Sequence, residues 1–218
     1  MKMKKIMITV SLVLSVILAS SLPAFAQDNV TNEVKQKKNN IEGDLQLDDP
    51  NVQISKPLTF DEMAEILAKD NQITKSEASK KLINSFDKNK TRSISPYSAT
   101  YRTLTTTLYV TSGYKPTLKY YCQTEESGGF RAIKKVLHVG MNRSYGGISK
   151  AFNGQIYTYL EDPNRIKYTV NGDFYHYGTT TTGVGLDLNV GEAATINLNA
   201  SRQSDWWKYF YKEGYFYF

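Results

Sequence analysis

Residues 184–200 read VGLDLNVGEAATINLNA, and this stretch decides the fold class of the chain. In both halves apolar residues alternate with Gly, Asp, Asn or Thr. Alternation with a period of two is the pattern of a strand that buries one face. A three-residue loop at 191–193 would bring Leu188 opposite Ile196, so that apolar side chains share a face. The stretch therefore predicts an antiparallel hairpin.

Strand-like composition extends over residues 96–218. All 16 tyrosines and both tryptophans of the chain lie there, and aromatic residues favour pleated, half-buried surfaces. Pairs typical of turns recur at short intervals in this region, at residues 128–129, 146–147, 153–154 and 171–172. The pattern predicts a mainly β fold, an antiparallel β-sandwich or barrel-like domain over 96–218.

A second hairpin is expected at residues 166–177. Residues 171–172 are Asn-Gly, which favours a type I′ turn because both residues accept positive φ. A two-residue turn there would pair Tyr168 with Tyr175. It would also place Tyr175 and Tyr177 on the core face together with Tyr168.

Residues 58–90 predict a short helical hairpin that precedes the β domain. Thr59 and Glu62 have the spacing of a capping box, and Thr74 and Glu77 repeat it. Apolar residues at helical spacing follow each box.

The first 26 residues have the three parts of a secretory signal peptide. Lysines near the start precede an apolar run, and the segment ends in Ala-Phe-Ala at Ala26. We expect cleavage after Ala26 and a secreted, extracellular protein. The alternative is a membrane anchor, but the apolar run is shorter than the roughly 20 residues that span a bilayer, so no stable transmembrane anchor is expected. Residues 27–57 are polar and predict a disordered leader.

The charge of the chain is mild once the signal is removed. Three lysines leave with residues 1–26, so the net charge falls from +6 to +3 (6 − 3). Residues 96–218 carry 13 Lys and Arg against 9 Asp and Glu, a net charge of +4. That value suits weak attraction to anionic wall polymers or lipid headgroups, and it is far below the charge typical of nucleic-acid binding.

Few residues could carry catalysis. Cys122 is the one cysteine, and alternation places it on a face with apolar neighbours, which favours a buried, inert thiol. His138 and His176 are the only histidines and form no zinc motif. No pattern indicates a cofactor. A non-enzymatic protein is therefore expected, with a hydrolase of unrecognised site as an alternative.

The C-terminal aromatic segment is the candidate ligand-binding site, formed by Trp206, Trp207, Tyr209 and Tyr211. Simple alternation sends Trp206 to one face and the other three to the opposite face. One set must fill the core, and the other is then an exposed aromatic row that could stack on sugar rings. Burial of both faces is the alternative.

Two other segments, Tyr101–Thr111 and Thr179–Ala200, alternate apolar residues with small polar ones. Membrane-inserting hairpins of β-pore toxins share this pattern. A secreted antibacterial or membrane-active toxin is therefore a second alternative.

Residues 58–218 resemble small exported proteins of Gram-positive bacteria that have a short helical lead-in and a β domain rich in Tyr, Thr and Gly. The resemblance implies fold and location, and no active-site residue is carried over. We expect a secreted protein that binds at cell surfaces, with a cell-wall polymer such as glycan, or a surface protein, as its partner.

Overall fold

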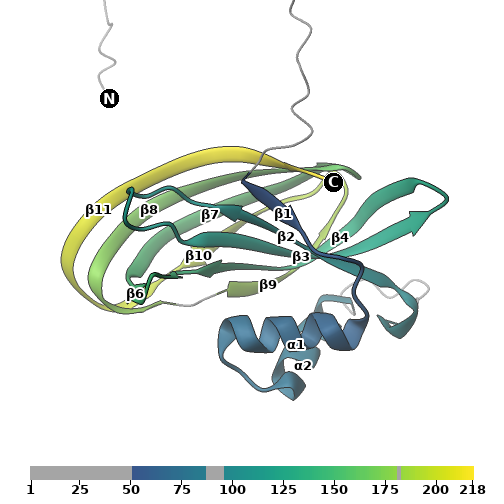
Figure 1. Ribbon diagram of the computed structural model, residues 1–218, viewed down its shortest axis with the longest axis horizontal. Helices are drawn as coiled ribbons and strands as arrows, with labels where there is room; N and C mark the ends of the chain where they lie inside the picture. Colours follow the sequence, from purple (N-terminus) through teal and green to yellow (C-terminus); the bar gives the residue numbers. More distant parts are fainter. Residues whose placement is uncertain (1–50, 87–95, 181–182) are drawn as a thin grey trace, which may run out of the picture. The chain divides into compact units, whose positions relative to one another are not determined.

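A computed structural model describes residues 51–86, 96–180 and 183–218 (Figure 1). The expected signal peptide, the leader up to residue 50 and the end of the helical hairpin lie outside these ranges. The helices are α1 (Phe60–Asn71) and α2 (Lys75–Phe86), followed by a short 3₁₀ helix at Pro96–Ser98. The strands are β1 (Val52–Ile54), β2 (Thr100–Thr107), β3 (Thr117–Ser127), β4 (Phe130–Asn142), β5 (Ser144–Tyr145), β6 (Ile148–Ser149), β7 (Ala151–Asp162), β8 (Arg165–Thr180), β9 (Gly183–Asn189), β10 (Ala193–Leu198) and β11 (Ala200–Tyr217).

Two antiparallel sheets form the body of the domain. The five-stranded sheet has the order β1-β2-β3-β4-β9, and the four-stranded sheet has the order β10-β7-β8-β11. Strands β5 and β6 pair separately as a small ribbon. The two large sheets pack face to face and stay separate, so the prediction of a mainly β, sandwich-like fold behind two helices is confirmed.

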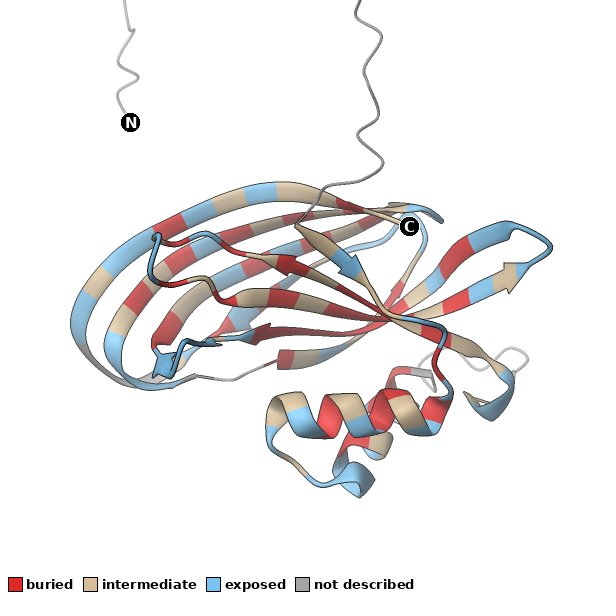
Figure 2. Cartoon of the chain, in the orientation of Figure 1, coloured by how far each residue is buried: buried red, intermediate tan, exposed pale blue. Residues whose placement is uncertain are grey.

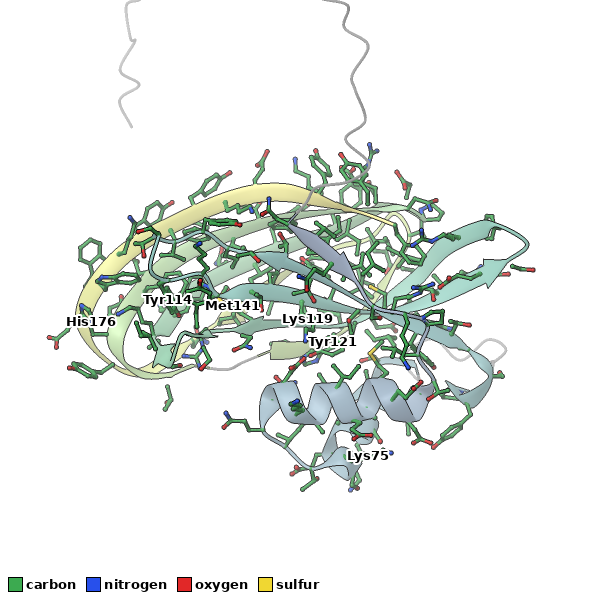
Figure 3. All side chains as sticks on the ribbon, in the orientation of Figure 1. Lys75, Tyr114, Lys119, Tyr121, Met141 and His176 are labelled. Carbon is green, nitrogen blue, oxygen red and sulfur yellow. The ribbon has the colours of Figure 1, made fainter. Side chains whose placement is uncertain are left out.

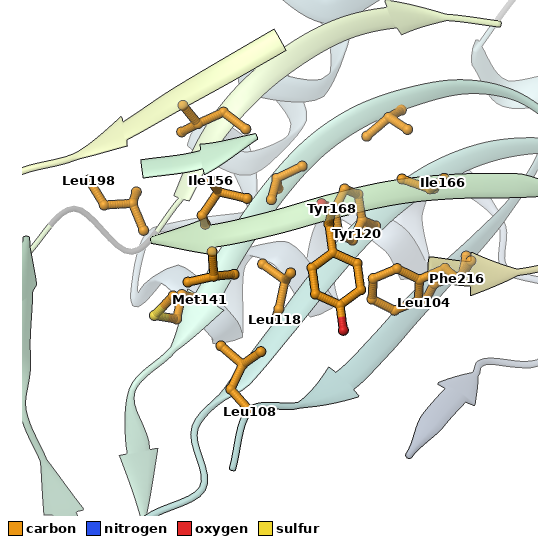
Figure 4. Close-up of a cluster of buried hydrophobic side chains, with 14 of the residues drawn as sticks. Leu104, Leu108, Leu118, Tyr120, Met141, Ile156, Ile166, Tyr168, Leu198 and Phe216 are labelled. Atoms are coloured by element: carbon orange, nitrogen blue, oxygen red, sulfur yellow. The ribbon is translucent and has the colours of Figure 1, made fainter. Parts of the chain in front are cut away.

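The core between the sheets is formed by buried, mostly apolar side chains from both large sheets (Figure 4). Tyr120, Tyr168 and Phe216 are fully buried there, and the Phe216 ring lies 4.9 Å from that of Tyr120 and 5.2 Å from that of Tyr168. The Tyr120 hydroxyl and Thr158 Oγ1 are 2.8 Å apart and share a hydrogen bond. This bond offsets the cost of burying two polar groups.

The two helices cover the outer face of the five-stranded sheet. Both predicted capping boxes are present: the Thr59 amide donates to Glu62 Oε2 over 2.8 Å, and the Thr74 amide donates to Glu77 Oε2 over 2.9 Å. The apolar side of the helices buries a second core against β2, β3 and β4, whose main members are Met63, Leu67, Leu82, Tyr101, Tyr121 and Leu137. The five-stranded sheet is thus buried on both faces, whereas the four-stranded sheet buries one face against described residues (Figure 2).

The expected turn at residues 171–172 is wrong, because β8 runs straight through them. Gly172 lies opposite Gly154 of β7 on the core side, and the Phe152 ring occupies the space that both glycines leave. A Cβ on Gly172 would lie 2.6 Å from Gly154 Cα and 2.7 Å from Phe152 Cζ. The glycine therefore serves close packing, and the actual β7–β8 turn is formed by Pro163 and Asn164. Residues 153–154, also expected as a turn, lie inside β7.

The strands expected in residues 184–200 are present, but they do not pair with each other as predicted. Strand β9 pairs with β4, with Leu188 opposite Val136, and β10 pairs with β7, with Ile196 opposite Ile156. The connection between β9 and β10 therefore passes from one sheet to the other. Both strands bury their apolar side in the shared core, so the alternation predicts their buried faces correctly. The expected pairing of the two strands with each other is wrong.

The end of the leader that was expected to be disordered includes a strand. Val52–Ile54 forms β1 and pairs with β2, with Gln53 opposite Thr105. Among the described residues, no helix is long and apolar enough to cross a membrane.

Candidate functional site

The outer face of the four-stranded sheet carries most of its tyrosines, and we call it the tyrosine face. Along β7, β8 and β11 the core residues alternate with residues that point away from the core. Figure 3 shows side chains projecting outward along much of β11. The aromatic residues of the tyrosine face are Tyr157, Tyr159, Tyr175, Tyr177, Trp206, Tyr209, Tyr211, Tyr215 and Tyr217.

A β-bulge in β11 changes which of the predicted site residues share this face. The pairing shifts between Trp206, opposite Tyr175, and Lys208, opposite Phe174. A bulge adds one residue to a strand, so the side chains that follow it point to the opposite faces from those that simple alternation predicts. Trp206 therefore joins Tyr209 and Tyr211 on the tyrosine face, where the three are 61, 52 and 54 % exposed. The expectation that Trp206 and Tyr209 lie on opposite faces is wrong.

Trp207 points toward the core side and belongs to a different cluster. Its ring packs edge-on against Tyr114 with the centroids 5.5 Å apart, and Lys150 Nζ lies 4.1 Å from the ring centroid. Lys150 Nζ also lies 3.0 Å from His176 Nδ1. Burial lowers the pKa of Lys150, which is only 8 % exposed. Trp207 thus contributes to packing, and it is not part of the exposed row.

The exposed aromatic residues of β11 lie beside a row of mostly polar residues on β8. Trp206 is opposite Tyr175, Tyr209 is opposite Asp173, and Tyr211 is opposite Asn171. Paired strands are about 4.8 Å apart, so each aromatic side chain has its β8 partner immediately beside it.

Two hydrogen bonds fix side chains of this pair of rows. Trp206 Nε1 donates to Asp173 Oδ1 over 2.9 Å, which orients the indole. The Tyr211 hydroxyl donates to Glu213 Oε2 over 3.2 Å, and this bond raises the pKa of Tyr211. Both carboxylates therefore act as acceptors that hold aromatic side chains in place.

A row of amides continues from Tyr211 across the other strands. Asn171 of β8 is opposite Gln155 of β7, which is opposite Asn197 of β10. All three side chains are exposed. Each amide offers both a donor and an acceptor, so the row can bind groups that donate and accept hydrogen bonds at once.

Two cations of the described part of the tyrosine face, Arg165 and Lys167, lie at its far end, near the β7–β8 turn. Arg165 forms ion pairs with Glu161 and Asp162, with N–O distances of 2.7 and 3.3 Å. Lys167 Nζ lies 5.9 Å from the Tyr215 ring centroid. Arg165 is therefore paired with acids, whereas Lys167 lies beside an aromatic ring.

The cysteine and the nearer histidine lie on opposite faces of the five-stranded sheet. Cys122 is buried in the core between the sheets, where burial raises the pKa of its thiol. His138 faces the helices, where it contacts Tyr121, and burial lowers its pKa to about 3. The two side chains cannot form a nucleophile–base pair in this arrangement. No group of three His, Cys, Asp or Glu residues suited to a metal occurs in the described ranges.

An open depression of about 480 Å³ lies between β9 and β10. Its lining residues include Leu186, Asp187, Glu192 and Ala194. Lys135 Nζ lies 2.5 Å from Asp187 Oδ1, so one of the two acids is already neutralised. The depression presents few groups that could orient a ligand.

Compared with protein-family models, with curated proteins and with solved structures, the chain matches none. The geometry of the tyrosine face is therefore what points to a function. Of the predicted site residues it unites Trp206, Tyr209 and Tyr211. Sequence reasoning missed Tyr175 and Asn171, because the expected turn placed the first in the core and the second in a loop.

Proposed function

We propose that the chain is a secreted, non-enzymatic protein of a Gram-positive bacterium that binds at cell surfaces through the tyrosine face. Its partner is cell-wall glycan or a surface protein. The observation that carries the proposal is the exposed aromatic row of β11 beside the polar row of β8, on the sheet face that no described element covers. Clustered exposed aromatic residues are typical of binding surfaces.

The composition of the face favours binding over membrane insertion. Its exposed aromatic residues are tyrosine and tryptophan, and exposed amides and a carboxylate lie among them. A lipid-facing surface would need a continuous apolar band, because unsatisfied polar groups are costly in hydrocarbon. The segment Tyr101–Thr111, which suggested a pore hairpin, includes β2, whose Leu104 and Tyr101 are buried in the two different cores.

A sedimentation assay tests the proposal. The full chain is mixed with purified Gram-positive cell walls, and the bound fraction is compared with that of Trp206→Ala and Tyr209→Ala. The control is Tyr109→Ala, because Tyr109 is 53 % exposed and lies outside the four-stranded sheet. We expect retention of the parent chain, about tenfold weaker binding for both face variants, and no change for the control.

Other results would contradict the proposal in informative ways. Equal retention of all variants would exclude the tyrosine face as the binding site. Dye leakage from liposomes without wall binding would indicate a membrane-active toxin, and release of soluble muropeptides would indicate a hydrolase.

A further inference from the structure

The pairing between β8 and β11 places stacking groups and hydrogen-bonding groups side by side. Tyr209 has Asp173 beside it, and Tyr211 has Asn171 beside it, at the strand spacing of about 4.8 Å. Consecutive outward residues on one strand are about 6.8 Å apart, so both rows continue in step along the sheet. The surface is thus a strip with one aromatic side and one polar side.

Sugar rings match both sides of such a strip. A pyranose presents C–H groups on its faces, which pack on tyrosine and tryptophan rings, and hydroxyl groups around its edge. Hydroxyls donate and accept at once, as the amides of Asn171 and Gln155 do. Tyrosine and tryptophan also lose little conformational entropy when a ligand fixes them.

The charges of the strip select among sugar polymers. Asp173 and Glu213 are its ionisable acids, and both hold aromatic residues by hydrogen bonds. Of the described cations of the face, Arg165 is paired with Glu161 and Asp162, and Lys167 is opposite Tyr215, toward the β7–β8 turn. Beside Trp206 and Tyr209 an anionic polymer would meet like charge at Asp173, which is unfavourable.

The strip is also open along its length, since none of the described elements covers this face of the sheet. An open surface suits a long chain that makes many weak contacts better than a single small sugar, which needs an enclosing pocket. We infer that the tyrosine face binds an uncharged polysaccharide chain that lies along β8 and β11, stacking on Trp206, Tyr209 and Tyr211 and hydrogen-bonding to Asn171. The inference rests on the proposed surface binding and names its ligand class.

Affinity electrophoresis tests the inference. The full chain is run in native gels that contain hydroxyethylcellulose, galactomannan, glycogen or glycol chitin as uncharged polymers, or alginate and polygalacturonate as anionic ones. The variants are Tyr209→Ala and Asn171→Ala, with Tyr209→Phe to keep the ring and Tyr109→Ala as the exposed-tyrosine control. Thermal unfolding of each variant confirms that it is folded.

We expect at least one uncharged polymer to retard the chain and neither anionic polymer to do so. Tyr209→Ala and Asn171→Ala should raise the dissociation constant about tenfold, whereas Tyr209→Phe and Tyr109→Ala should leave it nearly unchanged. Retardation by the anionic polymers alone, or unchanged binding of Tyr209→Ala, would overturn the inference.

The proposed function can survive the failure of this inference. If no uncharged polymer retards the chain while Trp206→Ala still loses wall binding, the tyrosine face binds another component of the wall, and this inference alone is wrong. If the walls and all the polymers fail to bind, both proposals are wrong.

Discussion

Trp206 and Trp207 are neighbours in the sequence, yet the β-bulge between Trp206 and Lys208 gives the two side chains different surroundings. Trp207 packs on Tyr114 and Lys150, whereas Trp206 is 61 % exposed. We expect Trp207→Ala to lower the free energy of unfolding by about 2–3 kcal/mol, because it empties a packed site. Trp206→Ala should change it by less than about 0.5 kcal/mol. Urea denaturation measures both, and equal losses would contradict the bulge.

His138 is a second residue whose surroundings imply a measurable effect. It is 1 % exposed, and burial lowers its pKa from the usual 6.5 to about 3. Between pH 6.5 and 3 the unfolded chain therefore binds a proton that the folded chain does not. The contribution of neutral His138 to the free energy of unfolding is thus fully present above pH 6.5 and is lost as the pH falls toward 3. The expected loss from this group is about 1.4 kcal/mol per pH unit near the middle of that range.

The variant His138→Gln isolates this contribution. Chemical denaturation at several pH values between 4 and 7 gives the slope of unfolding free energy against pH for both chains. The carboxylates and His176 are common to both chains. The slope of the parent should therefore exceed that of the variant by the value for one proton, about 1.4 kcal/mol per pH unit. Identical slopes would show that His138 titrates freely in the folded protein.

At the scale of the element, local sequence patterns predict strands and helices. Which strand pairs with which depends instead on residues far away in the sequence. Alternation within 184–200 is local, and both strands are present. That β9 lies beside β4 and β10 beside β7 follows from how the two sheets divide the core, which the stretch itself does not encode. The candidate site was affected in the same way, because the β11 bulge and the course of β8 decide which aromatic residues share a face.

Residues 171–172 show why a strong turn signal can fail. Asn-Gly supplies the backbone freedom of a turn, but glycine is also the residue that permits close approach of a neighbouring side chain. Here the Phe152 ring lies over the facing glycines of β7 and β8. The sequence does not distinguish the two uses, since the ring that needs the space is about 20 residues away.

Substitution of this glycine separates the two interpretations. In β8, Gly172→Ala places a Cβ 2.5 Å from the Asn153 carbonyl oxygen and 2.7 Å from Phe152 Cζ, so we expect a loss of about 2–3 kcal/mol or more in unfolding free energy. Gly113→Ala is the matched control, because nothing lies within 4 Å of its added Cβ. Thermal unfolding compares them. A small loss at residue 172, similar to that at Gly113, would contradict the continuous strand.

At the scale of the whole described domain, its layers explain why one surface is left for binding. The helices cover the five-stranded sheet, and Tyr121 and Lys119 attach α1 to it through Asp70 Oδ2, at 2.6 and 2.5 Å. The four-stranded sheet receives no such cover from the described residues, and its outer side chains are aromatic and polar. The same division of faces therefore provides both the stability of the domain and its candidate ligand surface.

This arrangement also predicts how binding depends on salt. The net charge of +4 over residues 96–218 would favour anionic walls at long range, and such attraction is screened as the Debye length falls from about 10 Å at 0.1 M salt to about 3 Å at 1 M. Stacking on Tyr209 and hydrogen bonds to Asn171 act at contact and involve no ion release. We therefore expect the fraction bound to purified walls to be nearly the same in 0.1 M and 1 M sodium chloride. If 1 M salt abolished retention of the parent chain, binding would belong to lysines and arginines outside the strip, and Tyr209→Ala would then have no effect at either concentration.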